Sequence, residues 1–173
     1  MKIISIDAST TCSGYGIFEN DKLIDYGAIT APESLDWRER ISYQCGQLMS
    51  LFKKYRPEIL YAEDVPAKDG KLTIEKLGAV QGMLITLCTA YKIKPYFLLP
   101  SKWRSNLNLF DGTKAGLQRD VLKKKAIEMA NEEFCLNLTW VAPKSKKNQD
   151  DVAEGILIGW SQIKPKNNPK SQS

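Results

Sequence analysis

The sequence MKIISID at residues 1–7 decides the fold of this chain. Its isoleucines predict a buried β-strand, and the strand closes on a carboxylate, Asp7. Residues 59–63, with the sequence ILYAE, predict a second buried strand that closes on Glu63. A carboxylate at the end of a buried strand is costly unless a cation compensates its charge. We therefore expect a sheet edge at which Asp7 and Glu63 meet a cation.

The remaining segments place these two strands in a mixed sheet. Further strands are predicted at residues 15–19, 23–29 and 95–99, and helices at 35–55, 72–91, 101–106, 113–131 and 150–163. Ser34 and Thr113 are the expected N-caps of the first and fourth helices. This order predicts an α/β fold, a mixed five-stranded sheet with helices on both faces. Its first and fourth strands would be parallel neighbours, so that Asp7 and Glu63 share one edge.

The chain is predicted to form one domain, residues 1–163, followed by a disordered basic tail, residues 164–173. The tail consists of Lys, Pro, Asn, Ser and Gln, which offer little surface to bury. No apolar run is long enough to span a membrane, and the first residues do not resemble a signal peptide. We therefore expect a soluble cytoplasmic protein.

Composition excludes several classes of catalyst. The chain has no histidine, which excludes Ser-His-Asp and Cys-His catalysis and any histidine-bearing zinc site. Its four cysteines include no C-x-x-C pair, so neither a zinc site nor a redox pair is expected. The net charge of +5 favours polyanionic partners without requiring them.

A second acidic group opens the last predicted helix. Asp151 and Glu154 are three residues apart and therefore lie on one face of that helix, with Asp150 as a spare acid next to them. An acidic first turn is also favoured by the helix dipole alone. Together with Asp7 and Glu63, however, the pair predicts a cluster of carboxylates of the kind that binds Mg²⁺ in two-metal nucleases.

In this order and spacing, these residues resemble the RuvC family of Holliday junction resolvases, within the ribonuclease H-like superfamily and closest to its phage-encoded branch. The resemblance covers residues 2–163. It is carried by Ile6-Asp7 with the following turn, Ala62-Glu63-Asp64-Val65, the segment KLGAVQG at residues 76–82, and Asp151-Val152-Ala153-Glu154.

The resemblance implies a homodimeric crossover junction endodeoxyribonuclease that cuts two opposed strands of a four-way DNA junction. Its catalytic metal would be Mg²⁺, with Mn²⁺ able to substitute, held by Asp7, Glu63, Asp151 and Glu154. The family usually carries an aspartate where this chain has Glu154, and Asp150 remains open as an alternative ligand. If the chain is phage-encoded, its place of action is the host cytoplasm.

Basic residues extend the same expectation to DNA binding. The family's DNA-contacting lysines fall near Arg104 and on Lys114, the latter with a catalytic role at the start of a helix. Lys144, Lys146 and Lys147 precede the acidic helix and are expected to contact phosphates, although a solvated loop would also explain them.

Three further segments carry expectations of their own. Residues 123–125, all lysine, are expected to form a solvated helix face. Gly78 and Gly82 either permit close packing on the sheet or mark the dimer interface. Pro66 stands where many family members carry an aromatic wedge, so we expect cleavage of forks and flaps as well as four-way junctions.

Two other functions remain open at this point. Residues 6–11, IDASTT, resemble the phosphate loop of sugar kinases and actin-like ATPases, but those proteins need two such lobes. The chain could also be a non-catalytic branched-DNA binding protein, which would have no need for clustered acids, since these repel phosphate.

Overall fold

The computed structural model describes residues 1–65, 70–110 and 113–164. Within these residues, five strands form one mixed sheet in the order β3-β2-β1-β4-β5. The strands are β1 (Lys2–Asp7), β2 (Cys12–Glu19), β3 (Lys22–Thr30), β4 (Ile59–Glu63) and β5 (Lys94–Leu98). The helices are α1 (Trp37–Tyr55), α2 (Lys71–Tyr91), α3 (Pro100–Asn106), α4 (Arg119–Phe134) and α5 (Asp150–Ile163).

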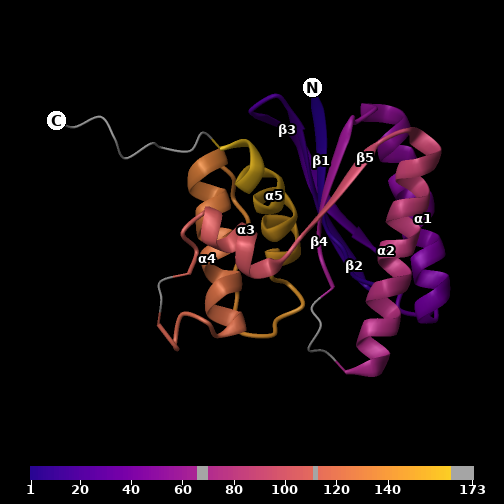
Figure 1. The fold of residues 1–173 in the computed structure, drawn as a ribbon. Coiled ribbons are helices and arrows are strands. Elements are labelled where there is room, and N and C mark those ends of the chain that lie inside the picture. Colours follow the sequence, from indigo (N-terminus) through magenta and orange to yellow (C-terminus); the bar gives the residue numbers. More distant parts are fainter. Residues whose placement is uncertain (66–69, 111–112, 165–173) are drawn as a thin grey trace.

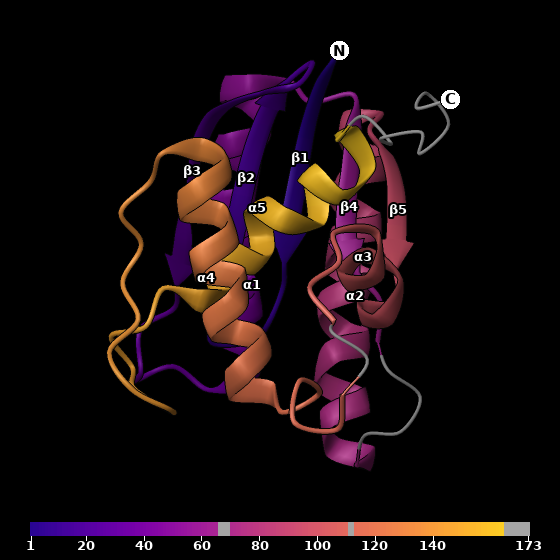
Figure 2. The same ribbon diagram turned by 90° about the vertical axis from the view of Figure 1, so that its left-hand side faces the viewer.

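The sheet has the predicted topology. β1 pairs with β2 in antiparallel register and with β4 in parallel register, and β5 continues the parallel part beyond β4. Helices α1 and α2 cover one face, while α3, α4 and α5 cover the other (Figures 1 and 2). The predicted mixed five-stranded sheet with helices on both faces is therefore confirmed.

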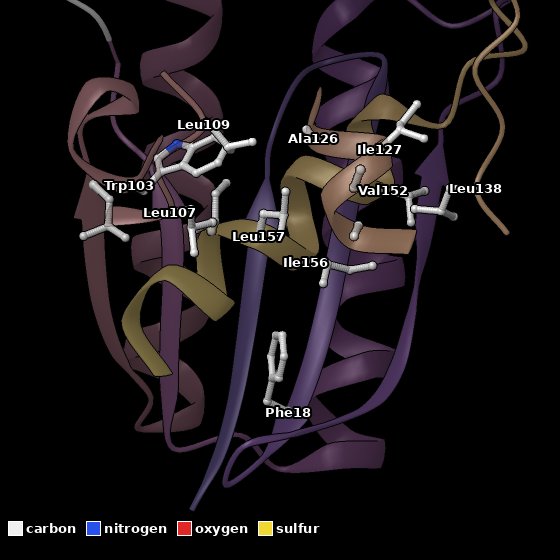
Figure 3. Close-up of a cluster of buried hydrophobic side chains, with 14 of the residues drawn as sticks. Phe18, Trp103, Leu107, Leu109, Ala126, Ile127, Leu138, Val152, Ile156 and Leu157 are labelled. Carbon is white, nitrogen blue, oxygen red and sulfur yellow. The ribbon is translucent and has the colours of Figure 1, made fainter. Parts of the chain in front are cut away.

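Alternation along β1 divides the core into two layers. Ile4 and Ile6 pack toward α1 and α2, whereas Ile3 packs on the opposite face with α5. Figure 3 shows part of this second layer, in which Ile156 and Leu157 of α5 lie among buried side chains from α3, α4 and β2. Asp7 is four residues after Ile3 on the same strand, so its side chain points to the same face, which α5 covers.

Helix α5 lies in backbone contact with the first two strands. A Cβ atom on Gly14 of β2 would overlap the carbonyl oxygen of Asp151. A Cβ atom on Gly155 would lie 2.5 Å from the carbonyl carbon of Gly14, and one on Gly159 would lie 2.5 Å from Ser5 Oγ. Glycine at these positions therefore allows the first turn of α5 to reach the end of β1.

The two predicted helix caps are wrong. Asp36, not Ser34, caps α1, because its carboxylate accepts from the backbone of Arg38 and Glu39 in a capping box. Thr113 does not start a helix; its Oγ1 accepts from the Gly116 backbone in a turn, and α4 begins at Arg119.

The predicted tail, apart from Lys164, lies outside the described residues. In the part of the chain that is described, no helix has the length and apolar character needed to cross a membrane.

Candidate active site

Four carboxylates from three segments line one pocket at the edge of the sheet. Asp7 and Glu63 end the parallel neighbours β1 and β4, and α5 brings Asp151 and Glu154 to the same edge. The pocket has a volume of about 520 Å³ and also receives side chains from α3 and α4. The open end of parallel strands is where α/β sheets hold their ligands.

Asp7 carries an uncompensated charge at the centre of this group. Burial raises its pKa well above the ordinary value, and the nearby carboxylates of Glu154, Glu63 and Asp151 raise it further. Among the described residues, no donor forms a hydrogen bond with the Asp7 carboxylate. Lys123 is the cation that opposes this increase, and the net raised pKa means that the charged form of Asp7 would be stabilised by a further cation.

Arg104 lies between two of the other carboxylates. Its Nη2 donates to Glu154 Oε1 at 2.7 Å and lies 3.8 Å from Glu63 Oε2. Its Nε is buried without a hydrogen-bond partner in the described structure. Trp103 Nε1 donates to Glu63 Oε2 at 2.9 Å and orients that carboxylate, whose pKa burial nonetheless raises. Two carboxylates thus hold the Arg104 guanidinium in place, and its Nε–H remains available as a donor.

Lys123 is a site residue that sequence analysis missed. We expected a solvated face, but the Lys123 side chain is only 19% exposed, because α4 packs against α5 at this point. Its ammonium group pairs with Asp150 and lies 3.8 Å from Asp151 Oδ1. Arg119 and Lys123 are four residues apart and therefore lie on one face of α4. That spacing could have indicated a basic helix face directed at the acids, because both side chains line the acidic pocket.

The ion pair between Lys123 and Asp150 gives Asp150 and Asp151 different surroundings. Asp150 is buried against Lys123 and does not line the pocket that contains Asp7. Asp151 does line it, and burial raises the pKa of its carboxyl group, with a further increase from Asp150. The geometry therefore favours Asp151 over Asp150 as a partner of Asp7.

The remaining predicted DNA contacts fall around this pocket. Lys114 is exposed in the turn before α4 and does not line the pocket, whereas Arg119 does. Lys144 and Lys146 line an adjoining cavity, and Lys147 is exposed outside it. Pro66, at the expected wedge position, lies outside the described residues.

The donor set fits a hard divalent cation. In this arrangement of the described residues, no three acidic or thiol side chains converge on a single point. Arg104 lies between Glu63 and Glu154, and Lys123 lies beside Asp151. All four pocket acids nevertheless offer oxygen ligands of the kind that Mg²⁺ prefers, and Asp7 lacks any other close partner. Asp7, Glu63, Asp151 and Glu154 are the residues that would hold the ion.

Comparison with known proteins agrees with this arrangement, although no family model matches the chain. The chain is 31% identical over 135 residues to the crossover junction endodeoxyribonuclease RuvC of Dictyoglomus thermophilum, covering 73% of this chain and 85% of the relative. Its fold is similar to that of T. thermophilus RuvC in complex with Holliday junction substrate, with a TM-score of 0.70 and 15% identity, over 93% of this chain and 92% of the other. The Fowlpox virus resolvase in complex with Holliday junction DNA gives a TM-score of 0.60 and 17% identity, over 94% and 97%.

Proposed function

The chain belongs to the RuvC family of crossover junction endodeoxyribonucleases, and we propose that its acidic pocket is the site at which it cuts Holliday junctions. The observation that carries this proposal is the meeting of Asp7, Glu63, Asp151 and Glu154 in one pocket. These acids come from three distant segments, and helix-dipole stabilisation of α5 alone would not require Asp7 and Glu63 beside it.

The metal that we propose for this site is Mg²⁺, with Mn²⁺ able to substitute, since the pocket acids offer only oxygen ligands. When bound, a pair of divalent ions supplies Lewis acidity for an attacking water and for the leaving 3′ oxygen. Asp7, Glu63, Asp151 and Glu154 would hold these ions through their carboxylates, all of which line the pocket.

Basic side chains in and around the pocket position the DNA backbone. Arg104 has a free Nε and would exchange Glu154 for the scissile phosphate once the carboxylates are neutralised. Arg119 lines the same pocket and serves the same strand. Lys114, Lys144, Lys146 and Lys147 contact other phosphates of the DNA.

The protein acts on branched DNA as a homodimer, because cutting two opposed strands in one binding event needs two active sites. Forks and flaps are proposed as further substrates, on the sequence argument at Pro66.

The chain acts in the cytoplasm, or in that of the host if it is encoded by a phage. A sugar-kinase-type phosphotransferase is not favoured, since the described residues form one sheet and not two lobes.

The decisive experiment compares Asp7→Asn and Glu63→Gln with the wild type on a labelled four-way junction in Mg²⁺. Cleavage should fall by about three decades or more, each decade corresponding to about 1.4 kcal/mol of barrier. Junction binding should be retained or become tighter, because negative charge near phosphate is removed.

Glu128→Gln is the matched control, because Glu128 is an exposed acid of α4 whose partner is Lys124 rather than a pocket residue. It should cut at the wild-type rate. Cleavage by Asp7→Asn at the wild-type rate would show that the metal site lies elsewhere.

A further inference from the structure

A second cavity adjoins the acidic pocket. Its volume is about 440 Å³, within the range of about 300–1,000 Å³ that is usual for ligand sites. Arg119, Lys123 and Asp151 line both hollows, so that the second cavity opens directly beside the catalytic carboxylates. Its outer wall is formed by Trp140, Lys144, Ser145, Lys146 and Asn148, which belong to the loop between α4 and α5.

That loop is held in shape by its own hydrogen bonds. Gln149 N donates to Thr139 O at 3.0 Å, and Thr139 N donates to Gln149 Oε1 at 2.9 Å. Asn148 closes the next ring, since Val141 N donates to its Oδ1 at 2.8 Å and its Nδ2 donates to Ala142 O at 2.8 Å. Residues 139–149 therefore form a compact loop that presents Trp140 and the lysines at a defined place.

Basic side chains outnumber acidic ones around the cavity, since Arg119, Lys123, Lys144 and Lys146 line it together with Asp120, Asp150 and Asp151. Lys123 is neutralised by Asp150 and Asp151. Lys146 pairs with Glu33 at 2.8 Å, but both side chains are exposed, so the pair is weak. Arg119 and Lys144 form no ion pair with any described residue, and both line the cavity. Two cations are thus free at a site whose neighbours are expected to bind divalent metal.

Trp140 supplies the other element of nucleic-acid binding. Its indole packs partly against the core beneath α5, yet it is only half-buried and forms part of the cavity wall. A role in the core alone would not explain why Trp140 shares this cavity with Arg119 and Lys144, neither of which forms an ion pair with a described residue. An aromatic wall beside free cations is the combination with which proteins hold an unpaired or distorted nucleotide, the base stacking and the phosphates meeting the charges.

We propose that this cavity is a nucleotide subsite that receives the residue of DNA adjoining the scissile phosphate. Trp140 stacks against its base, while Arg119 and Lys144 contact the phosphates on either side. The proposal rests on the nuclease function of the acidic pocket and adds to it a means of selecting the cleavage position. A base that stacks well on Trp140 would place its own phosphodiester bond at the carboxylates.

The test uses four-way junctions that carry 2-aminopurine at single positions on either side of the cleavage site. Ca²⁺ replaces Mg²⁺ in the fluorescence measurements, so that binding is observed without cleavage. In the wild type, the reporter at one flanking position should be quenched by stacking. Trp140→Ala should lose this quenching, and in Mg²⁺ should cut about ten- to hundredfold more slowly at an altered distribution of sites.

Trp140→Phe should restore both signals, since it keeps an aromatic face. Lys144→Asn removes the charge, and asparagine tolerates the left-handed backbone at this position, where φ is 62°. This variant should lower the salt dependence of DNA binding by about one phosphate contact. Lys124→Ala is the control for the loss of one exposed lysine, because Lys124 lies outside both hollows and pairs with Glu128, and it should leave quenching and cleavage sites unchanged.

The outcomes separate the two proposals. A wild type that cuts no branched DNA in Mg²⁺ or Mn²⁺ would contradict the nuclease function itself. An active wild type together with a Trp140→Ala variant of unchanged quenching, rate and cleavage sites would overturn the subsite alone. If Trp140→Ala proves unfolded by circular dichroism, Lys144→Asn decides, and an unchanged salt slope and unchanged quenching would overturn the subsite.

Discussion

Asp7 illustrates how the site lowers the stability of the protein that carries it. Its carboxylate is partly buried beside three other acids, and desolvation together with the charge of each acid raises its pKa. The folded protein therefore keeps a proton that the unfolded chain gives up near the ordinary value of 3.8. Stability consequently falls as pH rises through this value and on to the raised pKa of the folded state. At neutral pH and without metal, the Asp7 charge is a net cost to folding.

We predict that Asp7→Asn makes the metal-free protein more stable at neutral pH. The expected gain is about 1–3 kcal/mol, the usual cost of an unsatisfied buried polar group, which corresponds to about 2–4 °C in Tm for each kcal/mol. Thermal unfolding in EDTA at pH 7 measures it. Below pH 3.8 the wild type is protonated too, so the difference should vanish there. A variant no more stable than the wild type at pH 7 would show that the charge is compensated.

Helix α5 delivers two acids to the site because glycines let it touch the sheet. Gly155 faces the backbone of Gly14, and the main chain of Asp151 lies over Gly14 as well. Asp151 is therefore positioned by main-chain contact in addition to the interaction of its side chain with Lys123. A shift of α5 away from β2 would carry Asp151 and Glu154 away from Asp7.

We predict that Gly155→Ala and Gly46→Ala have opposite effects, although both place alanine inside a helix. A Cβ on Gly155 would lie 2.5 Å from Gly14 backbone atoms, so α5 must move, at a cost of about 1–3 kcal/mol or more. A Cβ on Gly46 meets nothing within 4 Å, so helix propensity should raise stability by about 0.5–1 kcal/mol.

Urea denaturation gives both values, and a cleavage assay in Mg²⁺ should show a loss of activity for Gly155→Ala alone. Equal stability of the two variants would mean that α5 is not held by this contact.

Across the molecule, α2 presents an unpartnered stripe on the face turned away from the sheet. Ile74 and Ile85 are 40% and 47% exposed, and Gly78 and Gly82 between them face open space. Two explanations were predicted for these glycines. The first, close packing on the sheet, is wrong, because a Cβ at Gly78 or Gly82 would meet no atom within 4 Å. The dimer interface remains our proposal for the stripe, because small residues allow two backbones to approach closely.

We predict that Ile85→Glu converts a dimer into a monomer. The buried charge would oppose association at the stripe while leaving the fold intact, because Ile85 contacts solvent in the single chain. Sedimentation at micromolar concentration measures the mass, and the variant should no longer cut both junction strands in one binding event. Ile24→Glu, a 42% exposed isoleucine on β3, is the control and should stay dimeric. A monomeric wild type would contradict the proposal.

The sequence by itself determined the order of the strands and helices and the acids that end or begin them, although it placed the start of α4 at residue 113 in place of Arg119. The isoleucines of residues 2–7 and the apolar run within residues 150–163 favour a buried strand and a buried helix through the local chain alone. The parallel pairing of β1 and β4 followed from the order of elements, and with it the common edge of Asp7 and Glu63.

Only the tertiary structure decided which side chains of a helix face the site. Lys123, Lys124 and Lys125 are equivalent in sequence, but only the direction of Lys123 meets Asp150, because α4 packs on α5 at one angle. The same packing distinguishes Asp150 from Asp151, and Gly14 acquires its role only when α5 crosses β2. These are contacts between segments far apart in the chain, and no local pattern encodes the orientation at which such segments meet.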